Sequence, residues 1–288
     1  MPEIKLFVCC HQPTQLPAHP LLVPIQLGAA LADARFPGFL HDDTGDNISK
    51  KNRAYCELTA QYWAWKNADA DYYGFFHYRR YLYPDVNARR PYRIEREPTL
   101  PLLDKLGYRG FSELIQRYDL IVPKGENMYL PVREHYANAP FHHRKDLALV
   151  EEIVRRRHPD MIPALERHLS GTICYFGNIF IMKRHIFHDY CAWLFPLLEE
   201  FDHSADLSSY SPQERRVDGY LAERLLGIYL TAEQDGLRCL ELPRVHFEPS
   251  AALRHKLQLL AIAIPPGTGR RAVAKAAERR AKRCLLGR

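Results

Sequence analysis

The sequence lacks the residue patterns of a structural metal centre and of a membrane span. Its seven cysteines are odd in number and lie mostly within apolar segments, and no CxxC or Cys/His ligand spacing occurs among them. We therefore expect reduced, buried thiols in a cytoplasmic protein and no structural zinc. No apolar run approaches the roughly 20 residues that a transmembrane helix needs. The first residues lead straight into a short apolar strand, so we expect no signal peptide.

Several catalytic signatures are missing as well. No Gly-rich loop follows the first expected strand, Ile4–Cys10, so a Walker or dinucleotide-binding fingerprint is absent. No Ser-His-Asp or Cys-His arrangement can be assigned. Asp69 and Asp71 match the Asp-x-Asp motif with which many nucleotide-sugar enzymes hold a divalent cation. They precede an apolar strand, however, instead of following it. We expect them to form a turn and predict no metal site, while a requirement for Mg²⁺ or Mn²⁺ stays open.

Basic charge is concentrated at the C-terminal end. The whole chain has a formal net charge of +6, yet Arg254 to Arg288 alone contains ten Lys/Arg and one Glu, so the rest of the chain is slightly acidic. This distribution argues against a nucleic-acid binder. The segment alternates apolar patches with Arg and Lys, which suits docking on an anionic membrane surface, and a solvated tail is the alternative. We therefore divide the chain into a domain of residues 1–249 and a basic amphipathic tail of residues 250–288.

Strand-like and helical segments alternate along the chain, which predicts an α/β three-layer sandwich with a mostly parallel central sheet. The expected strands cover residues 4–10, 72–76, 120–123, 175–182 and 239–247. The expected helices cover residues 55–67, 111–118, 147–157, 185–200 and 217–229. We also predict a short helix or a turn over residues 24–32, and an insertion or mobile flap over residues 83–100.

The apolar strand at residues 72–76 runs directly into His77, Arg79 and Arg80. Charged side chains at the exit of a buried strand are costly unless they face something anionic. A diphosphate meets that need, because guanidinium groups bind phosphate oxygens in a bidentate fork and fixed cations can neutralise a leaving diphosphate without a metal. The alternative is a structural network in which the two arginines pair with acidic residues of the polar loop at residues 42–52.

Three polar residues between positions 142 and 178 are candidates for contact with a sugar. His142 and His143 are adjacent, so on an extended segment they point to opposite sides and do not predict a two-histidine metal site. One of them can reach a sugar or phosphate while the other packs, and a satisfied polar loop is the alternative. Asn178 falls within an expected strand, where its buried amide needs either sugar hydroxyls or backbone groups as partners.

The helix expected at residues 217–229 carries the candidate catalytic carboxylates. Glu223 lies four residues after Gly219, whose lack of a side chain permits a ligand or another backbone to approach closely. A carboxylate here can deprotonate an acceptor hydroxyl, and the alternative is a buried pair with Arg224. Asp218 is the competing carboxylate on the same helix.

Several long motifs follow one another along residues 4–248. They are PIQLGAA, DDTGDNISKKN, YCELTAQYWAWKN, YGFFHYRRYL, HHxxDL, NIFIMKRHIFHDYCAWLFPLL and GYLAERLL. Together they resemble the bacterial family of capsular-polysaccharide and exopolysaccharide glycosyltransferases long catalogued as a domain of unknown function. The resemblance implies a GT-A-like (Rossmann-like) fold and transfer of a hexose, galactose in some relatives, from a nucleotide-diphosphate sugar such as a UDP-hexose.

The resemblance and the residue patterns together give the candidate site. The donor-binding candidates are Asp46, Asn47, Lys51, His77, Arg79 and Arg80. The candidates for binding acceptor or sugar are His142, His143, Asn178 and Arg224, and those for catalysis are Glu223 and Asp218.

We therefore predict a cytoplasmic hexosyltransferase, peripherally associated with the inner membrane, that acts in capsule, exopolysaccharide or O-antigen synthesis. Its predicted partners are the nucleotide-diphosphate sugar donor, a lipid-linked glycan acceptor and an anionic inner-membrane surface reached through the basic tail, with no nucleic acid. The alternative is a non-catalytic scaffold that binds sugar nucleotides or glycans in a polysaccharide assembly complex.

Overall fold

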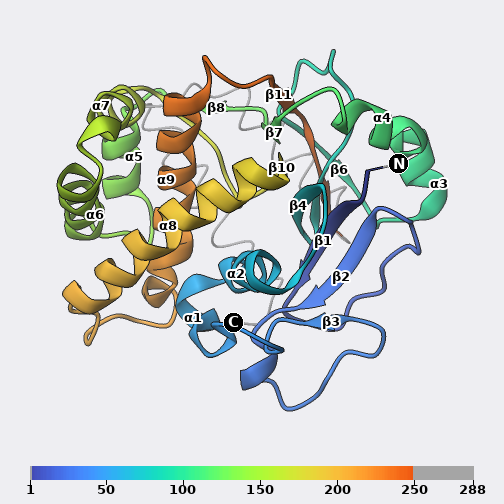
Figure 1. The fold of residues 1–288 in the computed structure, drawn as a ribbon, viewed down its shortest axis with the longest axis horizontal. Helices are drawn as coiled ribbons and strands as arrows, with labels where there is room; N and C mark the ends of the chain where they lie inside the picture. The colour runs from blue at the N-terminus through green and yellow to red at the C-terminus, as the bar shows by residue number, and fades with distance from the viewer. Residues whose placement is uncertain (1, 249–288) are drawn as a thin grey trace, which may run out of the picture.

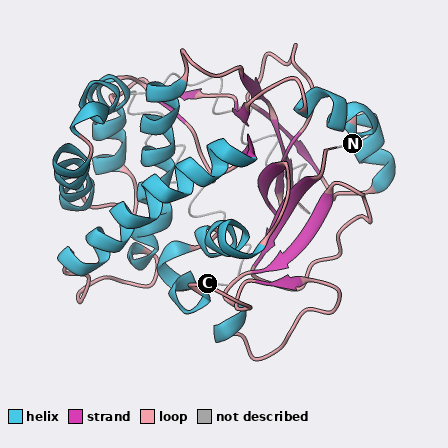
Figure 2. Cartoon of the chain, in the orientation of Figure 1, coloured by secondary structure: helices cyan, strands magenta, loops and turns pink. Residues whose placement is uncertain are grey.

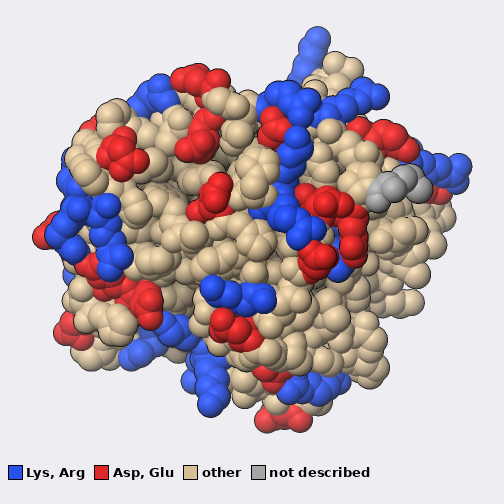
Figure 3. Space-filling view, in the orientation of Figure 1, with Lys and Arg blue, Asp and Glu red and all other residues tan. Residues whose placement is uncertain are grey.

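The computed structural model of the protein describes residues 2–248. The basic tail at residues 250–288 lies outside the described residues, so its docking on a membrane and the domain boundary at residue 249 stay predictions. Within residues 2–248, no helix combines the length and the apolar character that crossing a membrane requires. Basic and acidic side chains are interspersed over the face shown in Figure 3.

The described residues form a central sheet of ten strands, whose main path runs β11-β7-β10-β4-β1-β2-β3 (Figure 1). These strands are β11 (Cys239–Leu242), β7 (Leu120–Pro123), β10 (Phe180–Lys183), β4 (Tyr72–His77), β1 (Ile4–Cys10), β2 (Leu22–Gln26) and β3 (Leu40–His41). β10 is antiparallel to β4 and to β7, whereas the other pairs along the path are parallel. The prediction of a mostly parallel central sheet is confirmed.

β1 and β4 lie side by side in the middle of this sheet. Both are almost entirely buried, as expected for parallel strands that are covered on both faces. A Cβ on Gly74 would lie 2.4 Å from Cδ2 of Leu6, so a larger residue at this point of β4 would require the Leu6 side chain to move. Cys9 pairs with His77, and the segments that follow the two strands therefore leave the sheet at the same edge.

Three short strands extend the sheet. β5 (Arg80–Leu82) pairs with β4 and with β12 (Arg244–Phe247), and β6 (Tyr92–Glu95) runs parallel to β12. The mobile-flap alternative for residues 83–100 is therefore wrong at β6, because its backbone is paired within the sheet, and an insertion stays a prediction. A separate two-stranded sheet joins β8 (Glu126–Asn127) and β9 (Ile173–Cys174).

Helices cover both faces of the sheet (Figures 1 and 2). One face carries α1 (Asn52–Tyr55), α2 (Leu58–Asn67), α8 (Arg184–Ser204) and α9 (Val217–Glu233), and α5 (Val132–Asn138), α6 (Arg144–Arg157) and α7 (Ile162–Ser170) pack outside α8 and α9. The other face carries α3 (Leu100–Lys105) and α4 (Phe111–Ile115). The side chains of β1 alternate between two cores, with Phe7 in the first and Leu6 and Val8 in the second. The three-layer α/β sandwich predicted from the sequence is confirmed.

Positive φ angles interrupt two of the expected elements. The helix expected at residues 55–67 is divided into α1 and α2, because Cys56 has a φ of 52°. The strand expected at residues 175–182 is reduced to β10, since Gly177 and Asn178 have φ angles of 91° and 49° and turn the chain before the strand begins. Asn178 therefore lies in a turn and not inside a strand.

Two further expectations are corrected by backbone pairing. The strand expected at residues 239–247 is split at Pro243 into β11 and β12, because proline has no N–H to donate to a ladder. Residues 24–32, expected as a helix or a turn, begin within β2 and continue into a 3₁₀ turn at Ala29–Leu31.

Candidate functional site

A cavity of about 890 Å³ opens where β1 and β4 end. His11, just after β1, and His77, at the end of β4, contribute to its wall. The rest of the wall comes from Leu27 after β2, from residues around α1, from Asp202 near the end of α8 and from the segment that joins α8 to α9. Cavities at the carboxyl ends of parallel strands are the usual place for ligands in open α/β sheets.

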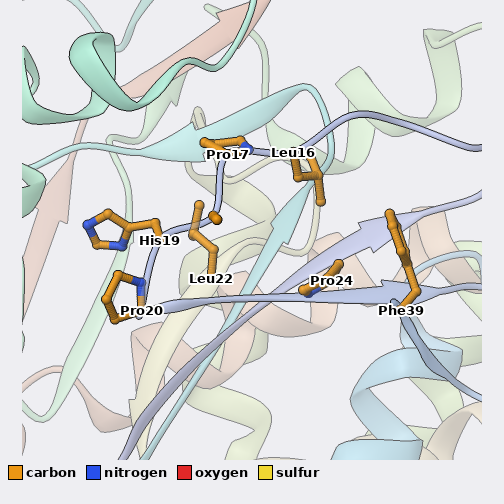
Figure 4. Close-up of a pocket in the computed structure, with 8 residues that line it drawn as sticks. Leu16, Pro17, His19, Pro20, Leu22, Pro24 and Phe39 are labelled. Atoms are coloured by element: carbon orange, nitrogen blue, oxygen red, sulfur yellow. The ribbon is translucent and has the colours of Figure 1, made fainter. Parts of the chain in front are cut away.

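A second cavity, of about 560 Å³, lies beside β2 and is largely apolar (Figure 4). It is lined by Leu16, Pro17, Ala18, His19, Pro20, Leu22, Pro24 and Phe39. His19 is the only titratable group in this lining, as far as the described residues show, and its ring packs edge-on against Tyr108 with the ring centres 5.5 Å apart. Because this cavity has little to offer a charged ligand, we place the candidate site in the first one.

Positive charge dominates the lining of the first cavity. The lining cations are Lys50, Lys51, Arg53, Arg215 and Arg216, and the lining carboxylates are Glu57 and Asp202. Nζ of Lys51 lies 2.8 Å from Oδ2 of Asp202, and Nε of Arg216 donates a hydrogen bond to Sγ of Cys56 at 3.2 Å. Low-dielectric walls that carry charge of one sign concentrate ligands of the opposite sign, so the cavity is suited to an anion.

His77 is placed in the wall of this cavity. Burial lowers the pKa of its imidazole far below the usual value, and the positive charges of Arg80 and Arg79 lower it further, so the ring is neutral at pH 7. Nδ1 accepts a hydrogen bond from the backbone N–H of Arg79 at 3.3 Å, which leaves the proton on Nε2. A neutral ring with this tautomer can donate one hydrogen bond to a phosphate oxygen.

Arg79 and Arg80 follow His77 but do not line the cavity. Arg79 is exposed, and its guanidinium lies 5.0 Å from the ring centre of Tyr78. Burial and the charge of Arg244 lower the pKa of Arg80, and the charges of nearby carboxylates oppose that change. Within residues 2–248 neither arginine forms an ion pair, so the alternative of a structural network with the acidic loop is wrong.

Asp46 and Asn47 lie in the loop at residues 42–52 but outside the cavity lining. Asp46 is exposed and accepts a hydrogen bond from the hydroxyl of Tyr62 at 3.2 Å. Asn47 donates through Nδ2 to the carbonyl of Asp43 at 3.1 Å. The structure shows both side chains holding the loop together, and their role at the donor stays a prediction.

Asn178 connects α2 and α9 with the turn that precedes β10. Its Nδ2 donates to Oε1 of Glu57 at 2.9 Å and to the carbonyl of Gly219 at 3.0 Å. Its own carbonyl accepts from Nε2 of Gln61 at 3.0 Å. Within the described part of the chain its Oδ1 has no partner. The backbone-bonded, structural interpretation of this residue is therefore observed, and contact with a sugar stays a prediction.

Both carboxylate oxygens of Glu223 already have hydrogen-bond donors. The backbone N–H of Gly177 donates to Oε1 and Nη1 of Arg224 donates to Oε2, each at 2.6 Å. Arg224 is buried, with its guanidinium over the rings of Tyr136 and Phe176. The alternative weighed for this pair, a buried Glu–Arg contact, is present in the structure, and the roles in catalysis and sugar binding stay predictions.

His142 and His143 point in different directions, as their adjacency predicts. The ring of His142 packs against those of Tyr136 and Tyr220, with ring centres 4.6 and 4.2 Å apart. Nε2 of His143 lies 2.9 Å from Oε1 of Glu214. Neither histidine lines the cavity, and contact of either with an acceptor stays a prediction.

Asp218 is fully buried at the start of α9 and does not reach the cavity. Burial raises the pKa of its carboxyl well above the usual value, and the neighbouring charge of Asp202 raises it further. The neutral form of the Asp218 carboxyl is therefore favoured, which argues against its predicted role as the base.

Asp69 and Asp71 lie at the opposite end of β4 from His77. Arg184 forms ion pairs with both carboxylates. Within residues 2–248, no group of three or more His, Cys, Asp and Glu side chains gathers in a way that could hold a metal ion. A requirement for Mg²⁺ or Mn²⁺ stays untested.

Sequence reasoning missed several residues of the cavity wall. Arg215 and Arg216 form a basic pair directly before the expected helix at residues 217–229, which was an available signal. Glu57 falls inside the aromatic helix expected at residues 55–67, so nothing in the sequence singled it out. The break at Cys56, which places Glu57 at the cavity, was not predicted. No sequence pattern marks Asp202, which is brought to the cavity only by the packing of α8.

Comparisons with known proteins agree with this architecture. The chain is similar to a solved structure titled "WbbM bifunctional glycosyltransferase apo structure", with 31% identity and a TM-score of 0.81. The match covers 85% of this chain and 45% of the other, so this chain spans less than half of that bifunctional protein. No curated protein matches the chain. The family model described as "Domain of unknown function (DUF4422)" matches residues 5–234, most of the chain, and the protein therefore belongs to that family.

Proposed function

We propose that the protein is a GT-A-type glycosyltransferase that moves a hexose from a nucleotide-diphosphate sugar, a UDP-hexose, to a glycan acceptor. The observation that carries the proposal is the cationic cavity at the ends of β1 and β4. The similarity to one part of a bifunctional glycosyltransferase supports glycosyl transfer as the reaction class.

The cavity has the charge that such a reaction needs. Breaking the bond between the sugar and the diphosphate leaves negative charge on the leaving group, and fixed cations that face this charge lower the barrier. Arg53 and Arg215 bind no carboxylate within residues 2–248, so no acidic side chain competes with a ligand for their guanidinium groups. Arg216, whose side-chain partner is the thiol of Cys56, and the Nε2–H of His77 add further donors to phosphate oxygens.

A divalent cation such as Mg²⁺ or Mn²⁺ would supply the same kind of charge neutralisation. The described residues provide basic groups and no carboxylate cluster at this cavity, so we derive no step through a metal.

We further propose that the acceptor is a lipid-linked glycan in capsule, exopolysaccharide or O-antigen synthesis, handled at the cytoplasmic face of the inner membrane. The support for this part is the sequence resemblance and the basic tail at residues 250–288, which would bring the protein to an anionic membrane surface.

Replacing one cavity cation tests the site directly. We expect Arg216→Gln to weaken UDP binding by about tenfold, because a charge-assisted hydrogen bond contributes about 1.5–3 kcal/mol. Isothermal calorimetry with UDP measures the binding, and UDP release from UDP-galactose with an acceptor panel measures turnover. Arg109→Gln is the matched control, since Arg109 is exposed and pairs with Asp104 away from the cavity.

Equal UDP binding by the wild type and both variants would contradict the placement of the diphosphate. Tight UDP-hexose binding by the wild type with no turnover on any acceptor would favour the non-catalytic scaffold instead.

A further inference from the structure

We propose that Glu57 is the catalytic base, the carboxylate that takes the proton from the attacking acceptor hydroxyl. This inference rests on the proposed function, because it assigns a role within the same cavity. It differs from the expectation based on sequence, which placed the base on α9 at Glu223 or Asp218.

The backbone directs Glu57 into the cavity. Cys56 has φ 52° and ψ −126°, and this turn separates α1 from α2 and leaves Glu57 at the N-cap of α2. α9 approaches this turn closely, since a Cβ on Gly219 would lie 3.3 Å from Sγ of Cys56. Glu57 therefore sits where α1, α2 and α9 meet the cavity, and it contributes to the cavity lining.

The other carboxylates near the site are either fully buried or already accept hydrogen bonds from charged or backbone donors. Asp218 is fully buried behind the lining. Both oxygens of Glu223 accept short hydrogen bonds. Asp202 lines the cavity, but its Oδ2 accepts from Nζ of Lys51 at 2.8 Å and from the hydroxyl of Tyr55 at 2.9 Å, so an ammonium already neutralises it.

Glu57 alone among these has an uncharged side-chain partner and no cation bound to its carboxylate. Its Oε1 accepts from the amide of Asn178 at 2.9 Å, and within residues 2–248 no other side chain donates to Oε2. Asn178 thus fixes the carboxylate without neutralising it, which is the arrangement of a positioned base.

The electrostatic surroundings strengthen the basicity of Glu57. Burial raises the pKa of its carboxyl and the negative charge of Glu223 raises it further, while the hydrogen bond from Asn178, the backbone amide of Glu57 and the charge of Arg216 lower it. The net effect is a pKa of Glu57 above the usual value for glutamate. A carboxylate with a raised pKa accepts a proton more readily, which suits a general base.

In the proposed step, the acceptor hydroxyl gives its proton to Oε2 of Glu57. The acceptor oxygen forms the new bond to the anomeric carbon of the donor sugar. The bond between that carbon and the diphosphate oxygen breaks, and its electron pair leaves with the diphosphate, whose charge the cavity cations balance. The proton on Glu57 then passes to solvent.

Glu57→Gln tests the assignment, because glutamine keeps the size of the side chain and an oxygen that can accept from Asn178. We expect UDP release from UDP-hexoses, with water or an added acceptor as the attacking group, to fall by about 10² to 10³-fold in kcat. UDP binding measured by calorimetry should stay within about threefold. The wild-type rate should fall as the pH drops below the raised pKa of Glu57, and Glu57→Gln should lose this acidic limb.

Three further proteins make the result decisive. Glu57→Asp keeps a carboxylate and should retain the acidic limb at a reduced rate, so it covers the case in which Glu57→Gln does not fold. Glu152→Gln, at an exposed carboxylate on α6, should behave as the wild type. Glu223→Gln should lower thermal stability more than Glu57→Gln does, because it disturbs the contact with Arg224.

A Glu57→Gln protein that turns over normally while the wild type shows the acidic limb would overturn the role of Glu57 and leave the glycosyltransferase proposal intact. Loss of UDP binding in Glu57→Gln would also overturn it, since a base should not hold the nucleotide. A wild type that binds UDP and releases none from any UDP-hexose contradicts the proposed function, and the base with it.

Discussion

The carboxylate of Asp42 accepts four hydrogen bonds while fully buried. The donors are the backbone N–H groups of Gly28 and Ala29, at 2.7 and 2.9 Å, and the hydroxyls of Ser49 and Thr59, at 2.5 and 2.6 Å. This one side chain connects the turn after β2, the loop that carries the cavity lysines and helix α2. A buried charge is tolerated when such donors satisfy it, so Asp42 holds the cavity wall together without touching the cavity.

Asp42→Ala should destabilise the protein strongly. It removes the acceptor of two backbone N–H groups and of the Ser49 hydroxyl, and each such buried group costs about 1–3 kcal/mol. We expect the free energy of unfolding to fall by about 3 kcal/mol or more, measured by urea denaturation. Asp46→Ala, in the same loop but exposed, should change it by about 0.5 kcal/mol or less. Equal effects of the two substitutions would contradict the role given to Asp42.

At the scale of an element, the turn before β10 decides where two of the carboxylates lie. Gly177 has a φ of 91°, and its N–H donates to Glu223. The next residue, Asn178, has a φ of 49° and donates to Glu57. The turn therefore orients one carboxylate on α9 and one at the start of α2, so its backbone geometry is tied to the chemistry of the cavity.

Gly177→Ala should weaken both the fold and turnover. An alanine at this φ is strained, at a cost of about 1–2 kcal/mol, and its Cβ would lie 3.3 Å from Cδ1 of Ile179. We expect a lower melting temperature and a several-fold lower kcat, with UDP binding nearly unchanged. Gly236→Ala is the control, because Gly236 has no positive φ and its nearest contact would be at 3.8 Å. A wild-type melting temperature for Gly177→Ala would show that the turn relaxes without cost.

At the scale of the whole molecule, charge is divided between the body and the tail. Five Lys/Arg of the body line the cavity, whereas the tail concentrates ten Lys/Arg within residues 254–288. We expect the proposed phosphate site and the proposed membrane-binding segment to act independently, because they use different residues of the chain.

Removing residues 251–288 tests this division. We expect the truncated protein to bind UDP as the full chain does and to lose most of its flotation with vesicles that contain anionic lipid. Flotation of the full chain should weaken at high salt and on neutral vesicles, because the attraction is electrostatic. Undiminished flotation of the truncated protein would remove the tail from the proposed membrane contact.

Local pattern was sufficient for much of the fold. The buried runs of β1 and β4, the apolar strand β7 and the long helices α8 and α9 were predicted, because hydrophobic content and periodicity depend on neighbouring residues. β6 and β2 were not predicted, since short Pro-rich segments become strands only when a partner strand pairs with them.

For the candidate site, the sequence by itself determined the chemistry that is present: a strand that ends in His77 and two arginines, basic pairs in flanking segments and a separate basic tail. Only the tertiary structure decided which groups meet. The break at Cys56, the turn at Gly177 and the packing of α9 bring Glu57 to the cavity and withdraw Asp218 from it. These contacts join residues far apart in the chain, and no local pattern encodes the free energy of such contacts.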